Sequence, residues 1–221
     1  RETPDSIFPN NWVSFHQDGT IALYPMFAEN RRDERRKDIL ELLQKEGYKV
    51  SRIKDFSQNE LANKFLEGTG SMILDRDNHI VYAALSDRTN REVLLEFCEE
   101  FSYSPIIFHA YQSVEGKRLP IYHTNVMMGL TDHLAIICLE CVDDHRERIE
   151  LIDSFTKTGK EIIELSELQV ANFAGNMLAV QNEAGDKMLI MSESAYRSLE
   201  QSQVKQIEKY YKILSSPLDT I

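Results

Sequence analysis

The sequence predicts an α/β fold made of four copies of one unit, and three observations support this prediction. Four stretches each contain two short apolar segments separated by a tight polar turn, which is typical of a β-hairpin. A charged segment with helical periodicity and a further apolar segment follow each hairpin. The hairpins begin near residues 12, 71, 125 and 176, so neighbouring units are 59, 54 and 51 residues apart. Each unit therefore has the order strand, strand, helix, strand.

The first two units are predicted near residues 9–65 and 66–115. Their hairpins turn at Asp-Gly and Asp-Asn, which tolerate the positive φ that tight turns need. In the first helix, Ile39, Leu42 and Leu43 fall on one side, as a single buried stripe requires. The expected strands are 12–16, 20–25 and 48–53 around a helix at 31–46, then 71–76, 79–85 and 105–111 around a helix at 89–102.

The last two units are predicted near residues 120–170 and 171–221. Their hairpins turn at "TD" and "NEAGD", and the second of these again contains residues that accept a positive φ. The expected strands are 125–130, 133–142 and 160–165 around a helix at 144–157, then 176–181, 187–192 and 210–216 around helical sequence at 193–209.

A repeat of this length, without sequence identity between its copies, favours a propeller-like or otherwise closed array. Closure removes the open sheet edge and the apolar face that a single unit exposes. The short segments that precede the four first strands then meet at the centre: they are 9–11, 67–70, 123–125 and 174–176. Glu67 and His123 lie in two of them, and such a pair suggests a functional site. For either residue alone, a structural role is the simpler interpretation.

The overall charge bounds the classes of partner. The 221 residues carry a formal net charge of −11, with a pI near 5.1, which argues against nucleic acid because phosphate binding needs clustered Lys and Arg. The basic cluster "NRRDERRK" at 30–37 is interleaved with acids and is typical of a solvated helix face. No signal peptide and no apolar run of membrane-spanning length is recognised, so we expect no membrane partner.

The three cysteines are an odd number, which argues against a disulfide scaffold and predicts a reducing, cytoplasmic location. Cys138 and Cys141 form a CxxC pair, but we expect a strand there, in which residues three apart point to opposite faces. No second Cys/His pair has zinc-site spacing. All three thiols, Cys98 included, are therefore predicted to be buried small hydrophobes, and no metal site is expected.

Four segments carry a resemblance to a known family: "FPNNWVSFHQDGTIALYPMFAENRRDERR", "LEGTGSMILDR", "RTN" at 88–90 and "YHTNVMMGL". Together they resemble the guanidino-modifying enzymes, which include arginine deiminase, dimethylarginine dimethylaminohydrolase and glycine amidinotransferase. The chain is most similar to the amidinotransferase-like, arginine-deiminase-related branch that contains citrulline hydrolases. The resemblance covers essentially the whole chain.

The resemblance implies a five-bladed α/β propeller, with residues 1–221 forming one incomplete domain of about four units. It also implies that parts of a fifth unit lie outside the chain at both ends. The family's nucleophilic cysteine is expected in a glycine-rich segment after Ile221, because no cysteine follows the fourth unit.

The resemblance further implies catalytic and substrate-binding roles. His123 takes the place of the catalytic histidine that protonates the leaving amine and then activates water. Glu67 takes the place of the acid that orients this imidazole. Arg88 matches an arginine that holds the substrate carboxylate as a planar bidentate donor. The residues expected around the group under attack are Asn10, Asn11, His16 and Asn125.

Two departures from the family pattern bear on the substrate. Relatives that process arginine carry an aspartate at the positions of His16 and Asn125. A guanidinium is a cation and favours carboxylates, whereas a neutral ureido group is held by amides through matched hydrogen bonds. The sequence therefore favours citrulline over arginine.

The leading hypothesis is a hydrolase that cleaves a C–N bond of a ureido or guanidino amino acid through a covalent thiol intermediate, without a cofactor. Amidino transfer to an amine acceptor is the alternative within the enzymes. A propeller that binds a partner without catalysing a reaction is the alternative from another class. The ligand expected in the first two cases is a small molecule.

Overall fold

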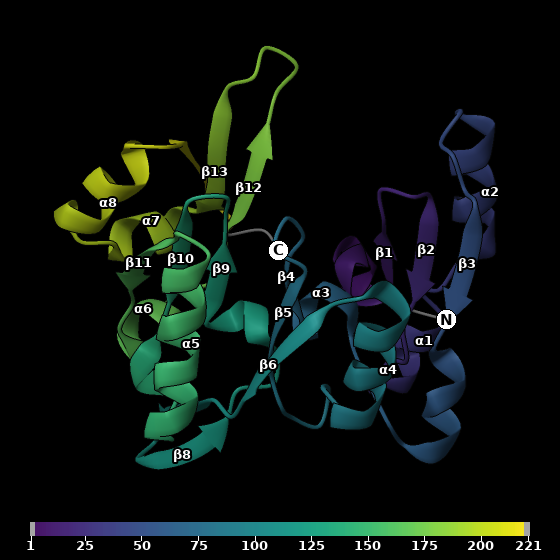
Figure 1. Cartoon of the computed structure of the whole chain (residues 1–221), viewed down its shortest axis with the longest axis horizontal. Helices are drawn as coiled ribbons and strands as arrows, with labels where there is room; N and C mark the ends of the chain where they lie inside the picture. Colours follow the sequence, from purple (N-terminus) through teal and green to yellow (C-terminus); the bar gives the residue numbers. More distant parts are fainter. Residues whose placement is uncertain (1–2, 219–221) are drawn as a thin grey trace.

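The computed structural model describes residues 3–218, which form four three-stranded sheets and one two-stranded sheet (Figure 1). In each three-stranded sheet the first strand is antiparallel to the middle strand, and the third strand is parallel to it. A helix lies between the second and third strands along the chain. The predicted α/β class and the unit order are confirmed. Closure into five blades stays a prediction, since the sheets within residues 3–218 are separate.

The first unit differs from the prediction in its helix. Residues 33–36 interrupt the helix expected at 31–46, and in the second of the two resulting helices Leu40 is the buried residue whereas Leu42 is exposed. The chain breaks there because Arg35 donates to the Tyr24 carbonyl (3.1 Å) and pairs with Glu60 (2.5 Å) instead of facing solvent. The elements are η1 Pro4–Ile7, η2 Pro9–Asn11, β1 Val13–Phe15, β2 Thr20–Leu23, α1 Glu29–Arg32, α2 Lys37–Lys45, β3 Arg52–Asp55 and η3 Ser57–Ala62.

The second unit contains a short helix that the sequence pattern did not predict. This helix, α3, spans Gly68–Ser71 and begins at Glu67. The long helix α4 starts where the Asn90 side chain accepts from two backbone amides, and it ends at Ser102 in the left-handed conformation. The other elements are β4 Ile73–Asp75, β5 Ile80–Ala84, α4 Arg91–Phe101 and β6 Ser104–Phe108.

The third unit is preceded by a hairpin that was not predicted, and the strand expected at 105–111 ends at Phe108. The strand expected at 133–142 also ends early, at Ile137, and a 3₁₀ turn follows. The elements are β7 Tyr111–Val114, β8 Lys117–Pro120, η4 Thr124–Val126, β9 Met128–Leu130, β10 Leu134–Ile137, η5 Leu139–Cys141, α5 His145–Lys157 and β11 Glu161–Glu164.

The turn η5 changes the geometry of the CxxC pair. The prediction that Cys138 and Cys141 point to opposite faces is wrong, because residues three apart eclipse one another in a 3₁₀ turn. Their sulfur atoms lie 2.8 Å apart. Both residues are nevertheless fully buried, and Cys98 is buried on α4, as expected of small hydrophobes.

The fourth unit begins after a short helix, α6, which was not predicted and which starts with a capping box at Ser166. The helical sequence expected at 193–209 is two helices, because Leu199 is extended and Glu200 caps the second one. The elements are α6 Glu167–Ala171, β12 Leu178–Gln181, β13 Lys187–Ser192, α7 Glu193–Ser198, α8 Gln201–Glu208 and β14 Lys212–Ser216.

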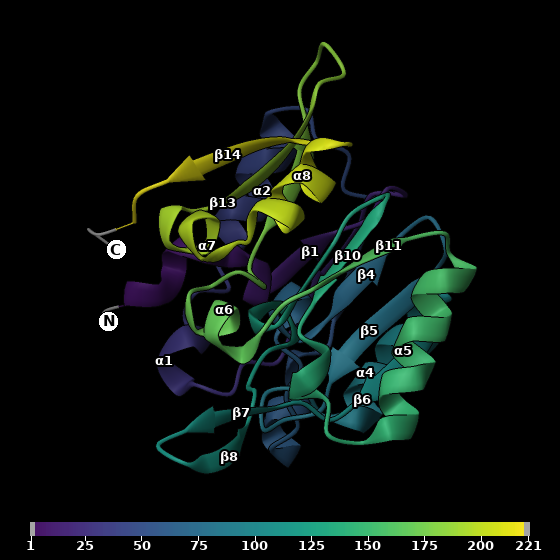
Figure 2. The same ribbon diagram turned by 90° about the vertical axis from the view of Figure 1, so that its left-hand side faces the viewer.

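Side chains on the two faces of a middle strand pack against different helices. On β5, Val81 and Ala83 belong to the cluster around α4 of the same unit, whereas Tyr82 belongs to the cluster around α5 of the next unit. The Tyr82 hydroxyl contacts the Ser154 hydroxyl on α5 at 2.8 Å. Figure 2 shows α5 running beside β5 and β6. The units therefore lie side by side, and α4 and α5 each fill the space between two sheets.

This stacking brings the segments before the first strands together, as predicted. A Cβ atom on Gly68 would lie 2.3 Å from the Asn10 carbonyl oxygen, so only glycine permits this approach. A Cβ atom on Gly175 would lie 2.3 Å from the Val126 carbonyl oxygen. The contact between Glu67 and His123 joins the second segment to the third, so segments 9–11, 67–70 and 123–125 meet, whereas the fourth packs against residues 126 and 127, directly after the third.

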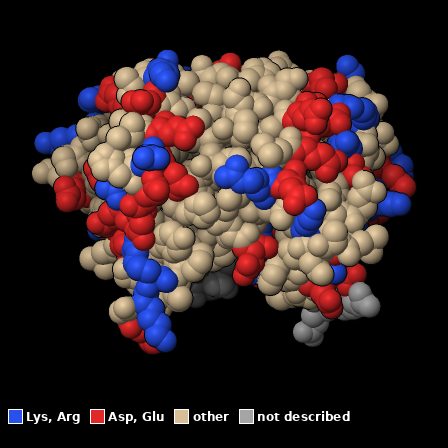
Figure 3. Space-filling view, turned by 60° about the horizontal axis from the view of Figure 1, so that its bottom comes forward, with Lys and Arg blue, Asp and Glu red and all other residues tan. Residues whose placement is uncertain are grey.

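The surface carries charges of both signs. Figure 3 shows acidic and basic side chains interspersed over one face of the molecule. Many of them form ion pairs, for example Arg118 with Asp143 at 2.5 Å and with Glu167. Within residues 3–218, none of the helices combines the length and apolar character that a membrane span needs.

Candidate active site

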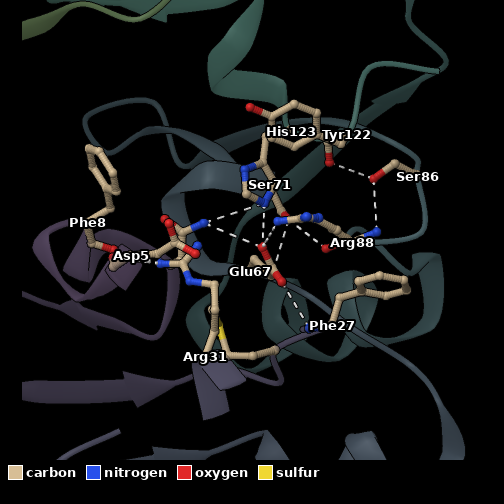
Figure 4. A network of polar contacts seen from close by, with 12 residues as sticks. Asp5, Phe8, Phe27, Arg31, Glu67, Ser71, Ser86, Arg88, Tyr122 and His123 are labelled. Atoms are coloured by element: carbon tan, nitrogen blue, oxygen red, sulfur yellow. Dashed lines mark hydrogen bonds and ion pairs between the residues drawn. The ribbon is translucent and has the colours of Figure 1, made fainter. Parts of the chain in front are cut away.

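A buried carboxylate and a buried imidazole form the centre of the site (Figure 4). His123 lies in extended backbone directly before η4, and Glu67 lies directly before α3. The Nε2 atom of His123 is 2.6 Å from Oε2 of Glu67, and the Glu67 side chain is completely buried. The two residues come from different units, so the fold creates this pair.

Glu67 receives further hydrogen-bond donors. Its Oε1 accepts from the Phe27 amide at 2.9 Å, and its Oε2 faces Nη1 of Arg88 at 3.4 Å and Nδ2 of Asn11 at 3.5 Å. Burial raises the pKa of this carboxyl, but His123, the Phe27 amide and the Arg88 charge together outweigh burial and lower it below its usual value. Glu67 is therefore an anion near neutral pH.

The imidazole is neutral near neutral pH. Burial lowers the pKa of His123, Glu67 partly offsets this effect, and the Arg88 and Arg31 charges lower the pKa further. Because Glu67 is an acceptor only, the proton of the neutral ring belongs on Nε2, and Nδ1 is left to accept a proton. Asn11 Nδ2 lies 3.5 Å from Nε2, but two donors cannot bond to each other, so this amide donates to Glu67.

Arg88 stands at the edge of the pair between two aromatic rings. Its guanidinium carbon is 5.7 Å from the centre of the Phe27 ring and 5.2 Å from that of Tyr122. Such contacts with ring faces orient a guanidinium. The Arg88 side chain keeps 29% of its surface exposed. It can therefore bind an anion from solvent while one of its nitrogens faces Glu67.

The other predicted binding residues lie in different places. Asn10 and Asn125 are half-buried beside Asn11 and His123 along the chain, and no hydrogen bond of either amide side chain is found within residues 3–218. His16 does not join this cluster. It lies beyond the opposite end of β1, where its ring stacks on Phe101 with centroids 4.0 Å apart and Nε2 contacts the Ser14 hydroxyl at 3.0 Å.

A group of arginines that the sequence pattern did not reveal supports the site. Arg31 and Glu34 are buried and form two bonds of 3.0 Å, and Arg31 also donates to the carbonyls of Asp5 and Phe8 at 3.3 Å. The prediction of a solvated helix face is thus wrong here. Main-chain carbonyls in irregular segments need donors, and a guanidinium supplies several at once.

Two more arginines hold the strand end that reaches Glu67. Arg32 donates to the Met26 carbonyl at 3.0 Å, and Arg35 donates to the Tyr24 carbonyl. Phe27 directly follows Met26, and its amide donates to Glu67. Their presence in the long segment that carries the family resemblance was the available signal.

The cysteines of residues 3–218 are buried free thiols. Burial raises the pKa of the Cys98 thiol to about 11. Contact with Cys138 and burial raise the pKa of Cys141 far above its usual range. No hydrogen bond within residues 3–218 joins a cysteine to His123. In the same part of the chain, no three His, Cys, Asp or Glu side chains are grouped as a metal site requires.

A comparison with protein families supplies the identity. The sequence model described as "N,N dimethylarginine dimethylhydrolase, eukaryotic" matches residues 1–221. The chain belongs to this family. The resemblance to guanidino-modifying enzymes is therefore confirmed. A comparison with curated protein sequences finds no significant match.

Solved structures of three related kinds have the same fold. The N-terminal domain of ArgZ, an arginine dihydrolase of the cyanobacterial ornithine–ammonia cycle, superposes with a TM-score of 0.68 at 16% identity, over 97% of this chain and 70% of that one. Unliganded AgrE gives 0.70 at 16% identity, over 97% and 28%. DDAH from Pseudomonas aeruginosa, a mutant complexed with citrulline, gives 0.61 at 22% identity, over 97% and 70%. These likenesses, at 16–22% identity, show the fold, whereas family membership supports a hydrolase of guanidino-type groups.

Proposed function

We propose that this protein hydrolyses a C–N bond of a ureido or guanidino amino acid, with citrulline as the favoured substrate. The observation that carries this proposal is the buried Glu67–His123 pair, whose atoms are 2.6 Å apart. An anion beside a neutral imidazole is the arrangement that general acid–base catalysis needs. Membership of the N,N-dimethylarginine dimethylhydrolase family supports the reaction class.

The reaction we propose proceeds in two steps. The neutral His123 accepts the proton of a cysteine thiol, and the thiolate adds to the ureido carbon. The imidazolium is stabilised by Glu67 and gives its proton to the nitrogen that leaves when the C–N bond breaks. In the second step, His123 takes a proton from water, the hydroxide displaces the sulfur as a thiolate, and His123 returns the proton to that thiolate. His123 therefore carries out every proton transfer of these two steps. The carbamic acid formed from citrulline then decomposes to carbon dioxide and an amine.

The nucleophile we propose is a cysteine that follows residue 221 in the full-length protein, as the family resemblance implies. The three thiols of this chain suit the role poorly. All three are buried, and the pKa of Cys98 is about 11. A thiol with a raised pKa supplies little thiolate near neutral pH.

Charge supports citrulline over arginine and dimethylarginine. Glu67 is already paired with His123 and Arg88, and Glu34 is already paired with Arg31. The remaining side chains we assign to the ureido group are the amides Asn10, Asn11 and Asn125, which match a neutral group. Arg88 binds the substrate carboxylate. A guanidino substrate is the second candidate, because the family description names dimethylarginine.

We also propose that a fifth unit completes the ring, with all units in one domain. The exposed face of the fourth sheet supports this step. Leu178 and Leu214 lie on either side of Ile190 in the sheet, and all three are exposed. The equivalent face of β5 is covered by the helix of the next unit. A helix of a fifth unit would cover the fourth sheet in the same way.

The test uses the full-length protein with citrulline, arginine and N,N-dimethylarginine in separate assays. Citrulline should yield ornithine, ammonia and carbon dioxide, and His123→Ala should leave only a small residual rate. His145→Ala is the matched control, because His145 is an exposed residue at the start of α5 and should leave the rate unchanged. Substitution of Cys98, Cys138 or Cys141 by serine should also leave the chemistry intact.

Other outcomes would overturn specific parts of the proposal. Faster release of ammonia from arginine than from citrulline would overturn the substrate preference. Appearance of the amidino group on an added amine would indicate a transferase. An intact protein that turns over none of the three substrates would support a binding protein and refute hydrolysis.

A further inference from the structure

One serine hydroxyl links the backbones beside Arg88 and His123, the two residues to which the proposed function assigns the two ends of the substrate. The Ser86 hydroxyl donates to the Tyr122 carbonyl at 2.8 Å and accepts from the Arg88 amide at 3.1 Å (Figure 4). Tyr122 directly precedes His123. A single side chain therefore ties the backbone at the guanidinium to the backbone at the imidazole.

Two other hydroxyls extend this link to Glu67. The Ser71 hydroxyl donates to the Arg88 carbonyl at 2.7 Å and accepts from the Glu67 amide at 3.0 Å. The Thr124 hydroxyl donates to the Ser71 carbonyl at 2.5 Å and accepts from the Ala84 amide at 2.9 Å. We call Ser71, Ser86 and Thr124 the hydroxyl bridges.

At this point of the fold, the hydroxyl bridges join backbone segments that no common sheet joins. The segments around residues 67–71, 86–89 and 122–124 belong to different sheets or to none, and only isolated bridges at Leu66–Thr89 and Ser86–Thr89 pair their backbones. Backbone groups in such segments need other partners. The three hydroxyls supply such partners beside the direct bond from the Glu67 amide to the Arg88 carbonyl at 3.2 Å, and they contribute to how far apart the backbones lie.

We propose that Ser86 is a positioning residue that sets the distance between the Arg88 guanidinium and the His123 imidazole, and thereby selects substrates by side-chain length. This inference rests on the proposed function, in which Arg88 binds the amino acid carboxylate and His123 acts at the ureido carbon. The distance between those two groups of the substrate changes with each methylene. A misplacement of ~1 Å at a reacting centre can cost about 10²-fold in rate.

Ser86 is the hydroxyl bridge best suited to a test. Ser71 and Thr124 are completely buried and their loss endangers folding, whereas Ser86 is only half-buried. Ser51 offers a matched control, because its exposed hydroxyl donates to the Asp18 carbonyl at 2.9 Å outside the cluster described above. Ser51→Ala removes a comparable bond without touching a hydroxyl bridge.

The experiment measures kcat and KM of the full-length protein for citrulline and for its homologues with one methylene fewer and one more. We expect Ser86→Ala to lower kcat/KM for citrulline about tenfold and to reduce the preference for citrulline over both homologues. Ser86→Thr keeps the hydroxyl and should restore both quantities. Ser51→Ala should change neither. An equal loss on all three substrates would overturn the inference, because a merely structural role predicts it.

A second readout does not depend on turnover. His123 is faced by Glu67, by Arg88 and by Arg31, and the Arg88 charge lowers its pKa. If Ser86 holds Arg88 in place, Ser86→Ala should raise the pKa of His123 in an NMR titration of its imidazole, and Ser86→Thr should not. An unchanged pKa in Ser86→Ala would overturn the inference. If the wild type is inactive on every substrate, the proposed function fails, while this titration still decides whether Ser86 positions Arg88.

Discussion

The Nε2 atom of His123 lies 2.6 Å from Oε2 of Glu67, although 56 positions separate the two residues in the sequence. Both side chains are buried, so the contact is shielded from solvent and its electrostatic effect is strong. The negative charge of Glu67 stabilises the protonated imidazole that forms during the proposed reaction. The pair therefore acts as one unit.

Substitutions at the pair should be strongly non-additive. Glu67→Gln preserves the shape of the side chain but removes its charge, so we expect kcat to fall by about 10²-fold or more in the full-length protein. The double variant that carries both Glu67→Gln and His123→Ala should have a kcat no lower than that of His123→Ala alone. Steady-state kinetics measure this, with circular dichroism to verify folding. Independent, multiplicative losses would contradict the view that the two residues act together.

Arg88 should influence both substrate binding and the imidazole. Arg88→Met removes a positive charge that lowers the pKa of His123, so that pKa should rise. The same change should raise KM for an amino acid substrate, because the carboxylate loses its partner. Arg88→Lys retains the charge without the planar fork, so it should leave the pKa low and restore KM only partly. NMR titration and kinetics test the two effects separately. A pKa that does not move in Arg88→Met would sink this prediction.

The two glycines of α3 should respond differently to alanine. Gly68 has φ of +46° and a Cβ there would meet the Asn10 backbone at 2.3 Å, so Gly68→Ala should cost at least ~1–3 kcal/mol of unfolding free energy. A Cβ on Gly70 would lie 3.0 Å from Nδ2 of Asn11 and 3.1 Å from His123. Gly70→Ala should therefore lower kcat of the full-length protein, while it should cost less unfolding free energy than Gly68→Ala.

Gly116 is the control for this pair of substitutions. It has φ of +76°, and a Cβ atom at this position would have no neighbour within 4 Å among the described residues, so Gly116→Ala isolates the cost of the backbone conformation. Chemical denaturation measures the unfolding free energy of all three variants, and steady-state kinetics measure the activity of Gly70→Ala. A Gly68→Ala protein as stable as Gly116→Ala would show that the close approach to Asn10 is unimportant.

His16 should make the protein sensitive to acid. Burial, followed by the charge of Arg76, lowers the pKa of His16 from 6.5 to about 4, and Asp18 only partly opposes this. The folded protein therefore favours the neutral ring. This contribution to stability is complete above pH 6.5 and is lost as the pH falls from 6.5 towards 4. His16→Gln should make the decrease in Tm between pH 7 and pH 4 shallower. Parallel Tm profiles for the two proteins would rule this out.

The repeat and the pair were predictable because each depends on local signals. The hairpin turns, the helical periodicity and the spacing of the units all appear in contiguous stretches of sequence. Together they located Glu67 and His123 at equivalent points of two units. The motif around Arg88 placed it near the same site through the family resemblance.

Errors arose where a tertiary contact overrides a local pattern. The segment from Arg31 to Arg35 has the periodicity of an exposed helix, yet its guanidinium groups bind backbone carbonyls and break the helix. The CxxC segment has the composition of a strand, yet it turns at Cys138. His16 lies close to Asn11 in the sequence, but β1 carries it away from the pair.

The sequence by itself determined the strand, strand, helix, strand order within each unit, the number of hairpin units in the chain and the two residues of the central pair. Only the tertiary structure decided that Glu67 stays charged, that His123 stays neutral and that hydroxyls tie Arg88 to both. The physical reason is that the ionisation of Glu67 and His123, and the distances between the site residues, depend on burial and on contacts between distant parts of the chain. Asn11 and Glu67, for example, are in contact although they lie more than 50 positions apart in the sequence. A local sequence pattern carries no information about such neighbours until the units have packed.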